Sequence, residues 1–193
     1  LNAGTNTLTT NAGGTLASGT GAITLTSDAI ALGDTVTGTG NITLTPSTAS
    51  TGIGLGTGAA GAYSLNTAEI ALLTNGFTLI TIGNAAGTGA IVIGTGVQDV
   101  TFTDPVTIRS PAGAGSITVN GILRDSNGSG ILTLDGPGAT TTLNADIITD
   151  RVAITISDNV VINGAARTLD TTNGGAGGGA NICIAGTTDS PVT

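Results

Sequence analysis

A five-residue unit, in which apolar residues alternate with threonine or another small residue, recurs along this chain. The clearest copy, at residues 22–26, reads Ala-Ile-Thr-Leu-Thr. The copies lie at 22–26, 41–45, 79–83, 90–94, 116–120, 131–135 and 153–157. A period of two is the pattern of a β-strand with one buried face, and Ile, Val and Thr favour strands because their side chains are branched at Cβ. The unit therefore predicts an all-β fold with aliphatic side chains inward and threonines outward.

The spacing of the units indicates how the strands are arranged. Ile23 and Ile42 occupy the same place in successive units, and shorter apolar stretches at 30–32 and 53–55 fall between the main units. Strands thus recur roughly every 10 residues, and a full period is about 20 residues. Glycine- and asparagine-rich segments between them tolerate the positive φ angles of sharp corners. This pattern predicts one right-handed parallel β-helix, a β-solenoid, over residues 1–193, with about 20 residues per coil.

An antiparallel β-sandwich is the alternative, because it also has short strands at regular intervals. Residues 66–73 are the one segment with a helix-like composition. We expect a strand there as well, because the segment resembles residues 28–32, and Ile30 and Ile70 are separated by two nominal coils.

The composition restricts both the core and the partners. Aromatic residues make up 2% of the chain and charged residues 8%, so the core must be narrow and filled by aliphatic side chains. Twelve acidic residues against four arginines, with no lysine, exclude the clustered cations that nucleic-acid binding needs. No apolar stretch approaches the roughly 18 residues of a membrane helix. Because the chain opens at Leu1 without a start methionine, we expect it to be a fragment of a longer repeat protein.

The sequence does not support a catalytic site. The candidate carboxylates for a β-helical polysaccharide-active enzyme are Asp99, Asp104, Asp146 and Asp150, the last beside Arg151. Glycosidic cleavage needs two converging carboxylates, and the chain has no histidine and almost no aromatic platform for a sugar. We therefore expect solvated turn aspartates, no enzyme activity and no catalytic residues.

Turn sequences explain the remaining candidate ligand sites. Residues 170–174 and 125–128 have the sequence of Asx turns, so we expect no cofactor and keep structural calcium as the open alternative. The glycine-rich run at 174–179 lacks the lysine and the strand-loop-helix context of a phosphate-binding loop.

Cys183 is the only cysteine, and it alternates with Ile182 and Ile184. Inward isoleucines would turn the thiol outward, but burial as a small apolar side chain is the expected fate.

Threonine pairs are the one candidate binding surface. Thr24 and Thr26, with Thr43 and Thr45, would project from one flat face if their strands stack. The pairs Thr7/Thr9 and Thr101/Thr103 would extend this face. Such an array resembles the surface of ice-binding solenoids. Equivalent positions further along hold other residues, so β-propensity and solubility are the expected reasons for these threonines. The replacing residues are Gly83, Gly94, Arg109, Asn120, Asp135 and Ser157.

The repeat style carries a family resemblance. The units at 22–26 and 116–120, the run Val161–Thr171 and the following glycine-rich segment resemble the β-strand repeats of large bacterial surface exoproteins of the filamentous-haemagglutinin type. The resemblance implies a secreted or cell-surface filamentous protein with a β-helical shaft that acts in adhesion or as a fibre subunit. It also implies end-to-end self-association or continuation in a parent chain, and contacts with glycans or other cell-surface material.

Overall fold

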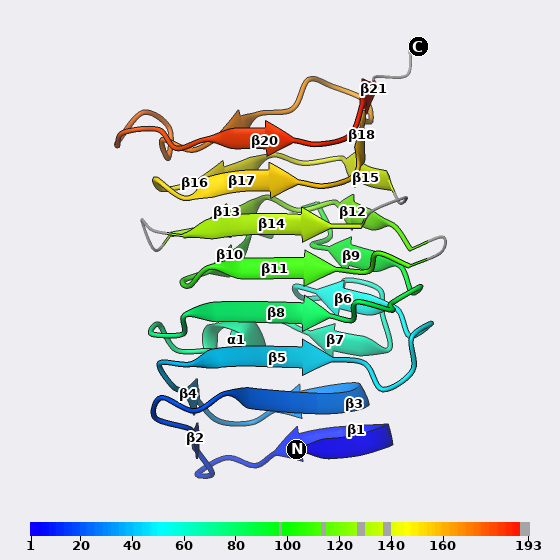
Figure 1. Ribbon diagram of the computed structural model, residues 1–193, viewed down its shortest axis with the longest axis vertical. Helices are drawn as coiled ribbons and strands as arrows, with labels where there is room; N and C mark the ends of the chain where they lie inside the picture. Colours follow the sequence, from blue (N-terminus) through cyan, green and yellow to red (C-terminus); the bar gives the residue numbers. More distant parts are fainter. Residues whose placement is uncertain (97, 113–114, 127–129, 137–139, 190–193) are drawn as a thin grey trace.

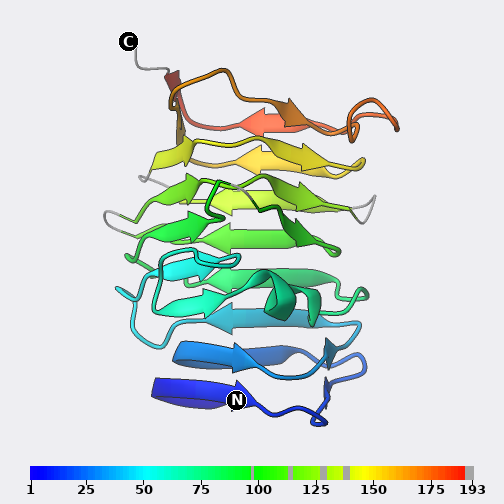
Figure 2. The same cartoon turned by 180° about the vertical axis from the view of Figure 1, so that it is seen from behind.

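A computed structural model describes residues 1–96, 98–112, 115–126, 130–136 and 140–189. The chain winds into a right-handed parallel β-helix, with the N-terminus at one end and the last coils at the other (Figure 1). Strands from successive coils lie one above the next and form the faces of the helix, as the view from behind also shows (Figure 2). The solenoid predicted from the sequence is confirmed.

Three faces contain all the named strands of the described chain. The eight-stranded sheet, in spatial order, contains β1 (Asn2–Thr10), β3 (Ile23–Leu32), β5 (Asn41–Thr45), β8 (Leu79–Gly83), β11 (Val106–Arg109), β14 (Ile131–Asp135), β17 (Ala153–Ile156) and β20 (Ile182–Ile184). The seven-stranded sheet contains β21 (Thr188–Asp189), β18 (Asn159–Ile162), β15 (Thr140–Leu143), β12 (Ile117–Val119), β9 (Ile91–Ile93), β6 (Ile53–Leu55) and β7 (Tyr63–Leu65). The third face contains a two-stranded sheet of β2 (Leu16–Ala17) and β4 (Val36–Thr37), and a four-stranded sheet of β10 (Val100–Phe102), β13 (Leu123–Asp125), β16 (Ile147–Thr149) and β19 (Leu169–Asp170).

Pairing within these sheets excludes the β-sandwich. Every pair of named strands in the described chain is parallel. The aliphatic positions of the repeated unit stack in register, so that Ile42 lies between Ile23 and Ile80, and Leu44 lies between Leu25 and Ile82. These side chains are almost completely buried. The core is therefore a set of aliphatic columns along the helix axis.

The coils differ in length more than the sequence predicts. Ile42 stacks on Ile23 after one short coil, whereas the coil from Ile42 to Ile80 is twice as long. The next coil, from Ile80 to Val106, is intermediate in length. The long coil contains β6, which pairs with β9 on one side and with β7 on the other. Because sheet pairing needs only matched strands, the connections between them absorb the differences in length.

The long coil also contains a short helix where the sequence predicts a strand, and that prediction is wrong. Helix α1 (Thr67–Ala71) begins at Asn66, whose side chain accepts a hydrogen bond from the backbone N–H of Glu69, while the Glu69 carboxylate accepts one from the Asn66 N–H. This reciprocal capping box stabilises the first turn. Leu73, just after the helix, bridges to Val36 of β4, and α1 contacts β10, so α1 fills the gap between the two sheets of the third face (Figure 2).

Candidate functional site

Six threonines form an unbroken column on the outer side of the eight-stranded sheet. Their strands pair in register, one threonine per coil. The column contains, in order, Thr24, Thr43, Thr81, Thr107, Thr133 and Thr155, and Cys183 occupies the next position. Parallel strands are about 4.8 Å apart, so this threonine ladder presents hydroxyl and methyl groups at that repeat. Its first two members belong to the threonine pairs predicted from the sequence.

A second column, beginning with Thr26 and Thr45, ends after two coils. Gly83 pairs with Arg109, and Arg109 pairs with Asp135, so charged and small residues take over as predicted. The predicted loss of threonines applies to this second column and not to the first, which continues through four more coils. Glycine and asparagine at 94 and 120 follow strands of the seven-stranded sheet and do not belong to this face.

The other two predicted threonine pairs lie elsewhere. Thr7 and Thr9 pair with Ala29 and Ala31, in the second half of the long strand β3, and not with the threonine ladder. Thr101 belongs to β10, and Thr103 follows it, on the third face. The prediction of one surface for all four pairs is therefore wrong, because similar local sequences occur at another register of the same sheet and on a strand of a different face.

An apolar groove lies beside the threonine ladder. It has a volume of about 490 Å³. Leu79, Pro105 and Ile131 line it together with Thr107 and Thr133 of the ladder. Ile131 is 48% exposed. This part of the face therefore combines hydroxyl groups with an uncovered aliphatic surface.

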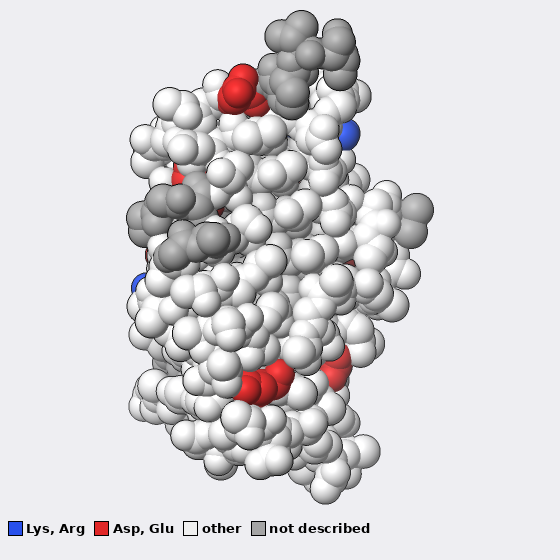
Figure 3. Space-filling view, turned by 90° about the vertical axis from the view of Figure 1, so that its right-hand side faces the viewer, with Lys and Arg blue, Asp and Glu red and all other residues white. Residues whose placement is uncertain are grey.

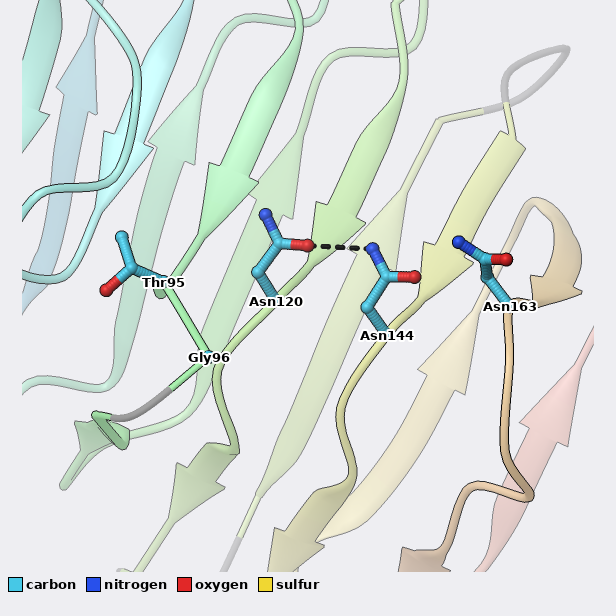
Figure 4. A pocket seen from close by; sticks show the side chains of 5 residues that line it. All are labelled: Thr95, Gly96, Asn120, Asn144 and Asn163. Atoms are coloured by element: carbon cyan, nitrogen blue, oxygen red, sulfur yellow. Dashed lines mark hydrogen bonds between the residues drawn. The ribbon is translucent and has the colours of Figure 1, made fainter.

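Three asparagines form a second ladder at the corner that follows the seven-stranded sheet. Asn120, Asn144 and Asn163 come directly after β12, β15 and β18, and their side chains project in a row into a groove of about 560 Å³ beside Thr95 (Figure 4). The amide nitrogen of Asn144 donates a hydrogen bond of 2.7 Å to the side-chain oxygen of Asn120. Asn120 and Asn163 each precede a glycine, and so belong to the glycine- and asparagine-rich segments that the sequence places at corners. The sequence does not reveal their stacking, which depends on coils of different length ending at the same corner.

Each carboxylate of the catalytic candidates has a structural partner. Asp99 forms an ion pair with Arg124. Asp104 accepts hydrogen bonds of 2.9 and 3.2 Å from the backbone N–H of Gly76. Asp146 accepts a bond of 2.9 Å from the N–H of Thr168, and the Oδ1 atom of Asp150 lies 3.2 Å from Nε of Arg151. The first three contacts link successive coils, whereas the last joins neighbouring residues.

The strand order separates the backbone positions of two of these candidates. Asp99 and Asp146 precede β10 and β16, which are separated by β13 and are thus about 10 Å apart in the sheet. Pairs of glycosidase carboxylates lie about 5 to 9.5 Å apart and face a shared sugar-binding groove.

Burial affects the pKa of two carboxyl groups. Burial raises the pKa of Asp158 above its ordinary value. The Thr141 hydroxyl donates a hydrogen bond to the carboxylate, which lowers the pKa but does not cancel the effect of burial. Burial likewise raises the pKa of Asp104, opposed by its backbone hydrogen bonds. Asp158 lies at the corner between β17 and β18, and no sequence pattern identified it.

The turn aspartate Asp170, which is half-buried, behaves in the opposite way. At Asp170, the hydroxyl and the N–H of Thr172 and the N–H of Gly174 all donate to the carboxylate, and these bonds lower its pKa. The Asx turn predicted at 170–174 is confirmed. Of the similar segment 125–128, residues 127 and 128 lie outside the described residues. In the described chain, no three acidic, cysteine or histidine side chains gather closely enough to hold a metal ion.

Cys183 is exposed, and the expectation of burial is wrong. Cys183 pairs with Thr155 at the end of the threonine ladder, while Ile182 and Ile184 pair with the core residues Ile154 and Ile156. The inward isoleucines therefore turn the thiol outward, because neighbouring residues of a strand point to opposite faces.

No protein-family model matches the chain, and no curated protein or solved structure is significantly similar to it.

The side of the molecule in Figure 3 is largely uncharged, with acidic atoms in a few patches and very few basic ones. Within the described residues, no helix is long and apolar enough to cross a membrane.

Proposed function

We propose that this chain is a rigid shaft segment of a secreted or cell-surface filamentous protein, with a structural or adhesive role and no enzymatic activity. The observation that carries the proposal is the sheet of eight parallel strands, in which the aliphatic side chains of the seven strands from β3 to β20 stack in register. Eight strands at about 4.8 Å extend the shaft by about 34 Å. Each coil contacts only its neighbours, so added coils lengthen such a shaft without changing its section.

The surface supports a role in weak, repeated contacts. The asparagine ladder offers amide donors and acceptors along a groove, and the threonine ladder offers hydroxyl groups beside aliphatic side chains. Both patterns match the hydroxyl groups and C–H surfaces of glycans, and neither depends on charge. A parallel β-helix with polar ladders and few charges fits the exterior of a cell, where solubility does not rest on lysine and glutamate.

Two measurements test this proposal. Antibody labelling and protease accessibility on intact producing cells should place the segment outside the cell, and an intracellular, protected segment would contradict the proposal. A glycan array should show weak binding that Asn144→Ala reduces at least threefold, with Thr118→Ala on the outer side of β12 as the matched control. Turnover of acidic glycans that is lost in Asp150→Asn would instead establish a β-helical polysaccharide-active enzyme.

The length of the threonine ladder supports a second candidate, an ice- or surface-binding module. A regular row of hydroxyl and methyl groups can match an ordered water layer, and six consecutive coils supply it. Thermal hysteresis should then be measurable and should fall at least fivefold in Thr107→Lys. Thr118→Lys places the same charge on the seven-stranded sheet and should leave the activity unchanged. A chain without thermal hysteresis would exclude ice binding.

A further inference from the structure

Four asparagines of the described chain are followed directly by a glycine. They are Asn75, Asn120, Asn163 and Asn173, while Asn127 lies outside the described residues. Asparagine is chemically labile, because the backbone nitrogen of the next residue can attack its side-chain amide carbon. Glycine allows the closest approach, since it has no Cβ. The nitrogen must be free to lose its proton, so the hydrogen bonding of each glycine N–H controls the reaction.

A hydrogen bond holds the glycine N–H in three of the four pairs. The acceptors are the Asp104 carboxylate for Gly76 at 2.9 Å, the Ile93 carbonyl oxygen for Gly121 at 3.0 Å and the Asp170 carboxylate for Gly174 at 2.7 Å. Such a bond keeps the proton on the nitrogen and fixes the peptide plane. The fold therefore protects Asn75, Asn120 and Asn173.

Gly164 differs from the other three glycines. Within the described residues its N–H has no hydrogen-bond partner. Asn144 and Asn163 occupy the same place in successive coils, since each donates its N–H to the end of the strand below, so Ala145 corresponds to Gly164. The N–H of Ala145 is also unpaired, although the coil that contains Asn163 lies above it. The shape of this corner, and not the next coil, thus leaves the group free.

Arg167 activates the same peptide group. Its Nη2 atom donates a hydrogen bond of 3.3 Å to the backbone carbonyl oxygen of Asn163, which belongs to the peptide that contains the Gly164 nitrogen. A cation at this oxygen stabilises the negative charge that develops when the nitrogen loses its proton. The side chain of Asn163 is exposed and makes no hydrogen bond to the described residues, whereas those of Asn120 and Asn144 are bonded to each other (Figure 4).

From these contacts we propose that Asn163 is a self-modification site, converted to aspartate and isoaspartate with the assistance of Arg167. The Gly164 nitrogen loses its proton and forms a bond to Cγ of Asn163, and the bond from Cγ to Nδ2 breaks. Ammonia leaves, and a five-membered succinimide remains. Water then opens this ring at the Cγ carbonyl to give aspartate, or at the backbone carbonyl to give isoaspartate. Either product places a carboxylate in the groove of the asparagine ladder, which is otherwise lined by neutral residues.

Peptide mapping by mass spectrometry tests the proposal on the intact chain in mildly alkaline buffer. Trypsin cleaves after arginine, so peptides 110–124 and 152–167 contain Asn120 and Asn163 separately. Asn120 is the matched control, because it belongs to the same ladder and also precedes a glycine. In the folded chain Asn163 should deamidate at least tenfold faster than Asn120. In urea the two rates should agree within threefold, because the protecting bonds are lost.

Arg167→Gln tests the role of the guanidinium group. It should slow the reaction of Asn163 at least threefold in the folded chain and leave the rate in urea unchanged, with an unchanged circular dichroism spectrum. Equal rates at Asn163 and Asn120 in the folded chain would overturn the proposal. A preference that persists in urea, or an unaltered rate in folded Arg167→Gln, would also overturn it. The proposal goes beyond the shaft role, since the reaction needs neither a cell surface nor a bound glycan.

Discussion

Ile108 lies at the middle of the core, and replacing it by alanine tests the stacked-column architecture directly. Its side chain is fully buried, with Ile82 on the coil before and Leu134 on the coil after. Ile108→Ala removes three carbon groups, which at about 0.8 kcal/mol each contribute about 2.4 kcal/mol to the free energy of unfolding. The cavity left behind adds about 1 to 2 kcal/mol, because coils fixed by sheet hydrogen bonds cannot collapse into it. We expect a loss of about 4 kcal/mol in total.

Equilibrium urea unfolding followed by circular dichroism measures this loss. Thr107→Ala is the matched control, because it alters the neighbouring residue on the outer face and should change the free energy of unfolding by less than about 0.5 kcal/mol. The reasoning would be refuted if Ile108→Ala cost less than about 1 kcal/mol at an unchanged urea dependence. It would equally be refuted if the two variants were indistinguishable.

Four further changes probe other parts of the fold. Asn66→Ala removes the N-cap of α1 and should lower the free energy of unfolding by about 1 kcal/mol in the same urea assay. Gly83→Ala should prevent folding or lower the free energy of unfolding by several kcal/mol, because φ is 104° and the new Cβ would collide with the carbonyl oxygen of Arg109. Gly178→Ala is the control: its Cβ would lie in open space, so thermal melting should show no change. Asp158→Asn should stabilise the chain at pH 7 and flatten its dependence on pH. Because the folded pKa is raised, the wild type gains stability as pH falls from above that raised value toward 3.8, and a variant with an unchanged slope would contradict this assignment. The folded pKa of Asp170 instead lies below 3.8, so its contribution is present above that pH and disappears as pH falls through the lowered value. Thermal melting of Asp170→Asn and the wild type should therefore differ at pH 7 and converge as pH falls through the lowered pKa. A constant difference would show that the carboxylate charge plays no part.

Local sequence determined the strands and their buried faces. The alternation at Ile23-Thr24-Leu25 places the isoleucine and leucine in the core and the threonine outside, because successive side chains of any strand point to opposite sides. Asp170 and its neighbours similarly define an Asx turn through contacts with Thr172 and Gly174. These features could be predicted because every interaction that creates them lies within a short stretch of chain.

Only the tertiary structure decided which repeated units stack. Thr43 and Thr81 become neighbours across the long coil, which includes an extra strand and a helix, whereas the similar pair at 101 and 103 lies on another face. The asparagine ladder depends on the same long-range register. Alternation within a strand fixes which side is buried, but the loops absorb any length between strands, so the sequence of one unit contains no information about its neighbour in the sheet.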